Sequence, residues 1–162
     1  MGTATSFDSN QFRSVLGCFA TGVTLITGCN KGTPVGLAAN AFTSVSLDPP
    51  YVLVCVARAS TTWPSIKETG RFAVNFLSEQ DEELCRKFSR SGEDRFAGVE
   101  WRAAMTGSPV LADALAYVDC ELATEHEAGD HDIVLGHVVD LGQQSDGRPL
   151  LFWRGGYGRL AE

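Results

Sequence analysis

The sequence has few basic side chains. Its 13 Lys and Arg residues are outnumbered by 20 Asp and Glu residues, which gives a formal net charge of −7 and an isoelectric point near 4.9. Nucleic acids and anionic membranes attract proteins that present a basic face. The charge therefore argues against either of these partners.

Long apolar runs are also missing, since no stretch approaches the ~18 apolar residues that a membrane-spanning helix needs. The N-terminal stretch MGTATSFDSNQF contains neither the basic region nor the apolar region of an export signal. We therefore expect a cytoplasmic protein with no membrane segment.

Closely spaced cysteines are absent as well. The five cysteines lie far apart and form no C-x-x-C motif. Their odd number, and the place of three of them in strand-like apolar runs, favour reduced and buried thiols over a disulfide framework. Cys85 has a basic neighbour, Arg86, but we expect this thiol to pack in the core rather than to act as a nucleophile.

The common motifs for nucleotide binding and for hydrolysis are not found. No strand-like run is followed by G-x-G-x-x-G or G-x-x-x-x-G-K-[ST], so a Rossmann or P-loop site is not expected. No serine stands in a G-x-S-x-G motif either. A bound nucleotide would have to be held in another way.

The sequence does contain many short alternating runs. A length of 162 residues with 44% hydrophobic residues fits a single globular domain, residues 1–162. Strands are predicted at 23–29, 35–40, 43–47, 51–57, 71–77 and 150–154, with two long strands between 116 and 144. Six or more strands with few helices predict an antiparallel barrel or sandwich, with 51–57 as a central strand buried on both faces.

Short helices are predicted at three places. The first is capped by Asp8 or Ser9 and ends at Gly22, and the second runs from Pro64 to Gly70. The third begins at Ser78, because Ser78 and Asp81 resemble a capping box. The segment 91–113 is expected to be irregular.

The stretch 36–56, GLAANAFTSVSLDPPYVLVCV, begins with unusually small side chains. Small residues followed by hydroxyls at a strand end let backbone N–H and C=O groups approach a planar heterocycle. A bulge or a close crossing of two parts of the fold would need the same small residues. The residues alone leave both interpretations open.

The stretch 57–64, ARASTTWP, places three hydroxyls between a strand and a helix. Ser60, Thr61 and Thr62 with consecutive backbone amides would suit a phosphate. Simple N-capping by one hydroxyl is the commoner use of such residues.

Histidines and aromatic residues near the C-terminus raise two further questions. His126, Asp130, His131 and His137 could be read as metal ligands, but no H-x-H or H-E-x-x-H spacing supports a metal site. His131 is better placed to contact a ligand lying over the end of the sheet. In the tail FWRGGYGRL, Tyr157 belongs either to a terminal strand that covers the core or to a lid over a flat ligand.

Six stretches in order resemble the short-chain flavin reductase family, whose members are NAD(P)H-dependent reductase components of two-component flavin monooxygenases. The resemblance covers about residues 10–158 and rests on FATGVTLIT (19–27), GLAANAFTSVSLDPPYVLVCV (36–56), STTWP (60–64), RFAVNFL (71–77), GDH (129–131) and RGGY (154–157).

This resemblance implies a mainly β fold, a six-stranded antiparallel Greek-key split β-barrel that binds FMN, with a few short helices. It also implies a homodimer that transfers a hydride from NADH or NADPH to FAD or FMN and supplies reduced flavin to a partner monooxygenase. No catalytic side chain and no metal are expected, because the two cofactors carry the reaction.

The resemblance further assigns residues to the cofactors. His131 and Tyr157 would lie at the nicotinamide, and Lys87, Phe88 and Ser89 would reach the flavin from the neighbouring subunit. Ala41 departs from the family, which often has serine there. The flavin-binding residues implied are Leu37, Ala38, Ala39, Asn40, Ala41, Phe42, Thr43 and Ser44, then Ala59, Ser60, Thr61 and Thr62, and finally Lys87, Phe88 and Ser89.

Two alternatives remain open at this point. A non-catalytic flavin-binding split-barrel protein would share the barrel and the phosphate contacts. A metal-dependent barrel enzyme of the cupin type would use His126, His131 and His137 as ligands.

Overall fold

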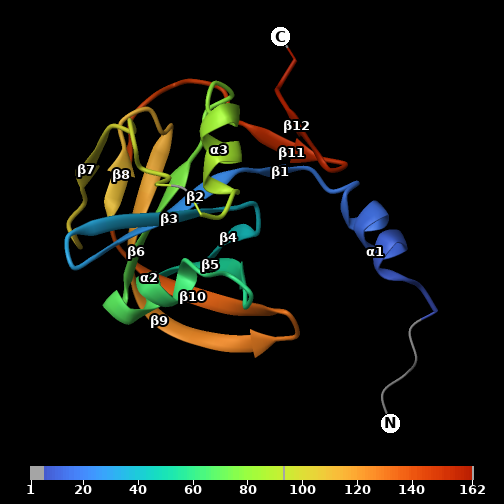
Figure 1. Cartoon of the computed structure of the whole chain (residues 1–162), viewed down its shortest axis with the longest axis horizontal. Coiled ribbons are helices and arrows are strands. Elements are labelled where there is room, and N and C mark those ends of the chain that lie inside the picture. The colour runs from blue at the N-terminus through green and yellow to red at the C-terminus, as the bar shows by residue number, and fades with distance from the viewer. Residues whose placement is uncertain (1–5, 93, 162) are drawn as a thin grey trace.

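The computed structural model describes residues 6–92 and 94–161, and this part of the chain is mainly β, as predicted (Figure 1). Its helices are α1 (Ser9–Leu16), α2 (Trp63–Thr69) and α3 (Glu82–Phe88). Its strands are β1 (Thr21–Gly22), β2 (Thr24–Asn30), β3 (Thr33–Ala39), β4 (Phe42–Leu47), β5 (Pro50–Ala57), β6 (Arg71–Phe76), β7 (Trp101–Ala103), β8 (Pro109–Leu111), β9 (Ala116–Ala128), β10 (His131–Gln143), β11 (Leu151–Trp153) and β12 (Gly156–Gly158).

Seven strands form one antiparallel sheet in the order β3-β2-β6-β9-β10-β5-β4. Its outermost strands, β3 and β4, are consecutive in the chain and only Asn40 and Ala41 separate them, so the sheet closes on itself. With β3 and β4 counted as one bent strand, the barrel has the six strands predicted. β6 returns beside β2 after the meander β2–β3/β4–β5, which is the Greek-key order.

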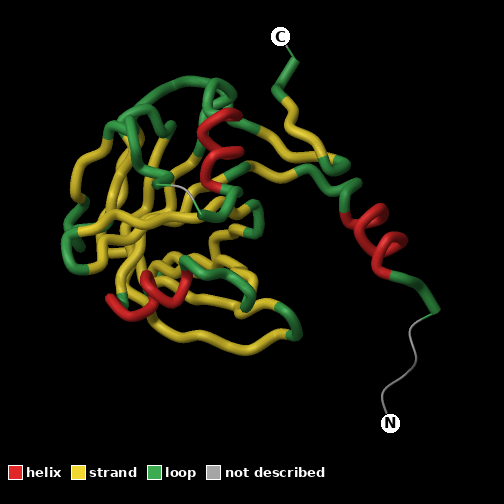
Figure 2. The backbone as a smooth tube through the Cα atoms, in the orientation of Figure 1, coloured by secondary structure: helices red, strands yellow, loops and turns green. Residues whose placement is uncertain are grey.

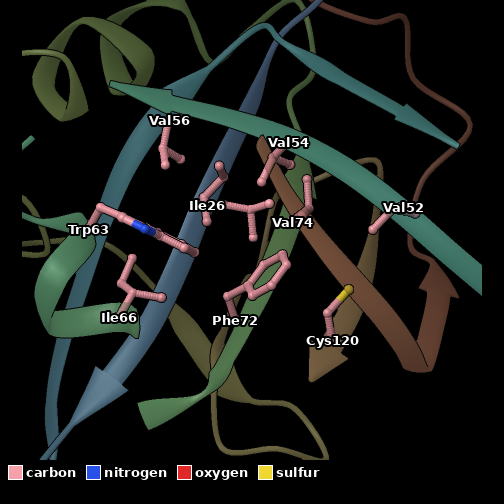
Figure 3. Packing of buried hydrophobic residues seen from close by; sticks show 10 residues of the cluster. Ile26, Val52, Val54, Val56, Trp63, Ile66, Phe72, Val74 and Cys120 are labelled. Atoms are coloured by element: carbon pink, nitrogen blue, oxygen red, sulfur yellow. The ribbon is translucent and has the colours of Figure 1, made fainter. Parts of the chain in front are cut away.

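The barrel interior holds a first hydrophobic core. Side chains from β2, β5, β6, β9 and β10 meet there, and α2 contributes Trp63 and Ile66, which are 4% and 0% exposed. The indole of Trp63 and the ring of Phe72 make an edge-on contact, with centroids 6.0 Å apart (Figure 3). Because α2 is fixed in this way, the loop 58–62 that precedes it has a defined position against the barrel.

A second hydrophobic core lies under α3. Leu25 of β2 and Phe88 of α3 are buried there together with Phe96 and Leu150. The neighbouring residue in β2, Ile26, belongs to the first core, so β2 is buried on both faces. β2 therefore separates the two cores of the molecule.

This double burial was predicted for the segment 51–57, and that prediction is wrong. In β5, Val52, Val54 and Val56 are buried, whereas Leu53 and Cys55 on the opposite face are only half-buried. The second core packs against β2, so it leaves the outer face of β5 without a covering layer.

Two predicted boundaries and one segment predicted to be irregular also differ from the structure. The first helix ends at Leu16 with Gly17 as its C-cap, well before Gly22. The third helix begins at Glu82, because the Asp81 carboxylate accepts a hydrogen bond from the Ser78 N–H at 2.7 Å and holds the chain in a turn. The segment 91–113 is not wholly irregular, since it contains the β7–β8 hairpin.

α1 projects from the body of the protein (Figure 2). Asp8 and Gln11 form a capping box at its start, so local hydrogen bonds define where it begins. None of its residues is buried, and Val15 is 68% exposed. Among the described residues, no helix combines the length and apolar character required to cross a membrane.

Candidate active site

A cleft lies where β3 bends into β4, and we call it the main cleft. Its volume is about 510 Å³, which is within the usual range of roughly 300–1,000 Å³ for small-molecule sites. The bend, the end of β5, the loop before α2 and the C-terminal end of α3 meet around it. The lining residues are Leu37, Ala38, Ala39, Asn40, Ala41, Cys55, Val56, Ala57, Ala59, Ser60, Thr61, Thr62, Phe88, Ser89, Ser91, Arg95 and His131.

The close-crossing interpretation of the small residues holds at Gly36, and the interpretation as a ligand site remains a prediction for the alanines. A Cβ atom on Gly36 would lie 2.7 Å from Cε1 of Phe88 and 3.1 Å from the Ile26 carbonyl oxygen, so Gly36 is small because α3 packs on it. Ala38, Ala39 and Ala41 instead line the main cleft. Their short side chains leave the backbone of the bend accessible from the cleft.

The hydroxyls of the loop before α2 form one corner of the main cleft. Ser60 Oγ accepts hydrogen bonds from the N–H groups of Thr62 and Trp63, at 3.2 and 3.1 Å, so the capping interpretation holds for Ser60. Thr62 Oγ1 accepts a hydrogen bond from Arg95 at 2.9 Å. Both hydroxyls keep a hydrogen that they can donate to a ligand.

Arg95 reaches this corner from the segment 91–113. Its Nη1 also donates to the Gly36 carbonyl oxygen at 2.7 Å, and its Nε donates to the Arg90 carbonyl oxygen at 2.8 Å. Arg95 carries the only permanent positive charge among the residues that line the main cleft. Sequence reasoning missed it, because no motif links Arg95 to a strand 59 positions away.

Two of the residues 87–89 line the main cleft within one chain. Phe88 and Ser89 lie there beside residues 37–41, and a contribution from a neighbouring subunit remains a prediction. Lys87 points elsewhere, and its Nζ donates a hydrogen bond to the Ala97 carbonyl oxygen.

Phe42, Thr43 and Ser44 also lie outside the lining of the main cleft. Phe42 packs against Phe76 with ring centroids 5.1 Å apart and belongs to the edge of the first core. Thr43 and Ser44 are exposed on β4. Within one chain these three residues and Lys87 therefore stand outside the lining of the main cleft, and their flavin contacts remain predictions.

His131 lies at the main cleft, as the G-D-H motif suggests. It is the first residue of β10 and pairs in register with Ala57 of β5, which also lines the cleft. The His131 Nδ1 and the Asp130 carboxylate are 2.8 Å apart. This hydrogen bond lowers the pKa of Asp130, so the carboxylate remains ionised and orients the imidazole.

The other two histidines do not join His131. His137 packs against Tyr51 with ring centroids 5.5 Å apart, and His126 contacts Thr124. In the part of the chain that the structure describes, no group of three His, Cys, Asp or Glu side chains is arranged to hold a metal ion. The three histidines therefore do not form the ligand set of a cupin-type site.

Tyr157 lines a smaller cleft of about 170 Å³, which shares Ala38, Ala39 and Asn40 with the main cleft. Its hydroxyl lies 3.2 Å from the Cys85 Sγ. Burial, together with this contact, raises the pKa of Tyr157 to about 12, so the phenol stays neutral. Burial also raises the pKa of Cys85, a packed thiol as expected.

The fold and the main cleft can be compared with known proteins. The model of the family described as Flavin reductase like domain matches residues 16–161. The reductase subunit HsaB of a flavin-dependent monooxygenase from Rhodococcus jostii (strain RHA1) is 44% identical over 154 residues, which cover 95% of this chain and 79% of that protein.

Two solved structures are also similar. A homologue of nitrilotriacetate monooxygenase component B from Mycobacterium thermoresistibile gives a TM-score of 0.92 at 43% identity, covering 95% of this chain and 87% of the other. The NADH:FAD oxidoreductase SgcE6 of Streptomyces globisporus C-1027, solved with NAD and FAD fragments, gives 0.90 at 35% identity, covering 99% and 98%. The likeness in sequence and in split-barrel structure extends over nearly the whole chain, which therefore belongs to the flavin reductase like domain family.

Proposed function

We propose that this protein is an NAD(P)H-dependent flavin reductase, the reductase component of a two-component flavin-dependent monooxygenase. It reduces FAD or FMN with NADH or NADPH and supplies the reduced flavin to a separate oxygenase. The observation that carries the proposal is the main cleft, which combines an accessible backbone, several hydroxyls and one arginine at the bend of a split barrel.

The residues of the main cleft fit a flavin. The bend from Leu37 to Ala41 offers a backbone edge to a flat ring system, because Ala38, Ala39 and Ala41 have short side chains. The hydroxyls of Ser60, Thr61 and Thr62 and the guanidinium of Arg95 offer donors to a phosphate. Ala59, Phe88 and Ser89 complete the wall.

A flavin accepts a hydride directly from a dihydronicotinamide, so the cofactors supply the chemistry. The chain binds and orients the rings and keeps water away from them. A reduced flavin ring gathers negative charge, and any backbone N–H group that the bend presents to the ring would stabilise that charge. Because the cofactors carry out the hydride transfer and the chain only positions them, the site needs neither a nucleophile nor a catalytic base.

His131 is the proposed contact for the nicotinamide. It lines the main cleft and its ring is held by Asp130, so it can present its other ring nitrogen toward a ligand. Tyr157 lies in the neighbouring small cleft, on the other side of Ala38 to Asn40. Tyr157 would contact a nicotinamide cofactor that extends over the bend into this small cleft.

A second copy of this chain is the proposed partner in a homodimer. Val45 and Leu47 on β4 are 52% and 94% exposed, and Leu141 on β10 is 65% exposed. β4 and β10 flank β5, whose outer face has no covering layer in one chain. A second subunit would cover these apolar side chains, which are costly to leave in water.

Steady-state kinetics test the function. Purified protein is mixed with NADH or NADPH and with FAD or FMN, and nicotinamide absorbance is followed for all four pairings. The proposal predicts rapid oxidation in at least one pairing. Tight flavin binding without oxidation in any pairing would instead identify a non-catalytic flavin-binding protein.

A further inference from the structure

Arg95 lies in the wall between two clefts. The second cleft, which we call the β3 cleft, has a volume of about 360 Å³, also within the range of roughly 300–1,000 Å³ for ligand sites. Thr61, Thr62 and Arg95 line both clefts. The remaining residues of the β3 cleft are Thr33, Pro34, Val35, Gly36, Gly92, Asp94 and Phe96.

The guanidinium of Arg95 is held in place by three hydrogen bonds. Nη1 donates to the Gly36 carbonyl oxygen and to Thr62 Oγ1, and Nε donates to the Arg90 carbonyl oxygen. These three hydrogen bonds hold the guanidinium, with its positive charge, at the wall that the two clefts share.

The β3 cleft has the chemistry of a nucleoside site. Pro34 offers apolar surface to a flat base, whereas the side chain of Val35 packs against the first core. The Asp94 carboxylate accepts a hydrogen bond from the Phe96 N–H at 3.1 Å and has further lone pairs for a ribose hydroxyl or an exocyclic amine. A phosphate that joins this nucleoside to a ligand in the main cleft would pass Thr61, Thr62 and Arg95.

We propose that the two clefts together form a site for FAD rather than FMN, with the adenylate half in the β3 cleft and the pyrophosphate on Arg95. The inference rests on the proposed flavin site in the main cleft. Arg95 is then the residue that binds the diphosphate, because its fixed guanidinium brings a permanent positive charge to the wall between the two clefts. The β3 cleft sets the preference between the two flavins.

The experiment measures dissociation constants for riboflavin, FMN and FAD by quenching of flavin fluorescence, without NADH. Wild-type protein is expected to bind FAD about 10-fold or more tightly than FMN. Thr33→Trp fills the β3 cleft from an exposed strand end and does not touch the main cleft. It is expected to weaken FAD binding to the level of FMN and to leave FMN binding unchanged.

Arg95→Gln tests the phosphate contact. Loss of charge-assisted hydrogen bonds is expected to weaken FMN and FAD binding about 10- to 100-fold and to leave riboflavin, which has no phosphate, unchanged. Arg90→Gln removes a charge from the same segment but does not line either cleft, so it serves as the matched control and should bind all three flavins normally.

Three outcomes overturn the inference. Equal affinity of the wild type for FMN and FAD, or equal weakening of both by Thr33→Trp, removes the adenylate site but leaves flavin reduction intact. A Thr33→Trp variant with a raised KM for NADH and unchanged FAD binding would assign the β3 cleft to the nicotinamide cofactor. A protein that binds no flavin would overturn this inference and the proposed function together.

Discussion

Arg95 and His131 reach the main cleft from distant parts of the chain, and each depends on a neighbour for its position. Arg95 is held by the Gly36 carbonyl oxygen and by Thr62, and His131 is held by Asp130. A side chain that is fixed before a ligand binds loses less conformational freedom on binding. These residues are therefore expected to affect affinity more than protein stability.

His131→Ala tests the proposed nicotinamide contact. Loss of one hydrogen bond is expected to raise KM for NADH about 3- to 10-fold, with a smaller effect on KM for flavin. Steady-state kinetics with each substrate varied in turn measure the two effects. His126→Ala is the control, because His126 lies on the same hairpin outside the main cleft. An equal rise of KM for NADH and for flavin in His131→Ala would indicate that His131 has a structural role only.

Ser60 and Arg95 differ in how well their roles could be predicted from the sequence. The hydroxyl run 60–62 predicted that one hydroxyl would cap the following helix, and Ser60 Oγ accepts hydrogen bonds from the N–H groups of Thr62 and Trp63. The phosphate contact predicted for the same run remains a prediction. Arg95 gave no signal, because its partners lie far away in sequence and its own segment has no regular period. Close contacts between distant segments are set by packing, which a local pattern does not encode.

At the scale of elements, the contact between β3 and α3 sets the shape of the main cleft. Gly36→Ala would place a methyl group 2.7 Å from Cε1 of Phe88, so α3 would have to shift. Overpacking of this kind costs about 1–3 kcal/mol. Chemical denaturation should show this loss, and flavin affinity should fall because Ser89 follows α3 directly.

The double variant Gly36→Ala/Phe88→Leu tests whether the contact with Phe88 causes the loss of stability in Gly36→Ala. A leucine at position 88 removes the ring edge that the new methyl group would meet. Phe88→Leu should therefore lower the free energy of unfolding less in the Gly36→Ala background than in the wild type. Additive losses would show that the contact with Phe88 is not the reason for glycine at position 36.

Asp119 on β9 links the barrel to the turn before β8. Its buried carboxylate accepts hydrogen bonds from the Thr106 N–H and hydroxyl at 2.8 and 2.6 Å, while burial raises its pKa. A raised pKa means that the folded state holds this proton more tightly than the unfolded state. The resulting contribution to stability is complete below about pH 4, the pKa of an unfolded Asp, and is lost as pH rises through the folded pKa.

Asp119→Asn removes this dependence while keeping an oxygen for the Thr106 N–H. The stability of the variant relative to the wild type should therefore increase from pH 4 toward neutrality. Urea unfolding of both proteins at several pH values measures the difference. A difference that stays constant, or that falls with pH, would contradict the assigned direction of the pKa shift.

The elements were predictable to different degrees. The strands of the barrel follow from alternation, because one face of each strand packs inside and the period is strict. The ends of the helices were less predictable, since Gly17 ends α1 early and the Asp81 carboxylate delays α3 until Glu82. The second core buries β2 on its other face, and this core forms between segments that are distant in the sequence. The runs 23–29 and 51–57 therefore did not indicate by themselves which of the two strands would be buried on both faces.

For the molecule as a whole, the strand that closes the barrel also carries the side chains of the proposed dimer interface. β3 and β4 are one bent strand, and the bend at Asn40 and Ala41 both closes the sheet and forms the main cleft. Beyond the bend, β4 carries Val45 and Leu47 on the outside of the barrel. That residues 1–162 act as one domain and that two chains associate remain predictions.

Leu47→Glu tests the proposed dimer. A charge at a side chain that is 94% exposed in one chain should cost little in the monomer but should disrupt an apolar interface. Size-exclusion chromatography with light scattering should give a dimer for the wild type and a monomer for the variant. Met105→Glu, at another exposed apolar position, is the control and should remain dimeric. A monomeric wild type would refute the dimer.

The central claim is that the cleft at the β3–β4 bend brings a nicotinamide and a flavin together for direct hydride transfer. Anaerobic single-turnover mixing of the protein and flavin with NADH deuterated at one face of C4 tests it most directly, with a chelator present. One NADH should be consumed for each flavin bleached, and only one of the two deuterated forms should slow the reaction. Bleaching that slows equally with both forms, or NADH loss without flavin reduction, would contradict it.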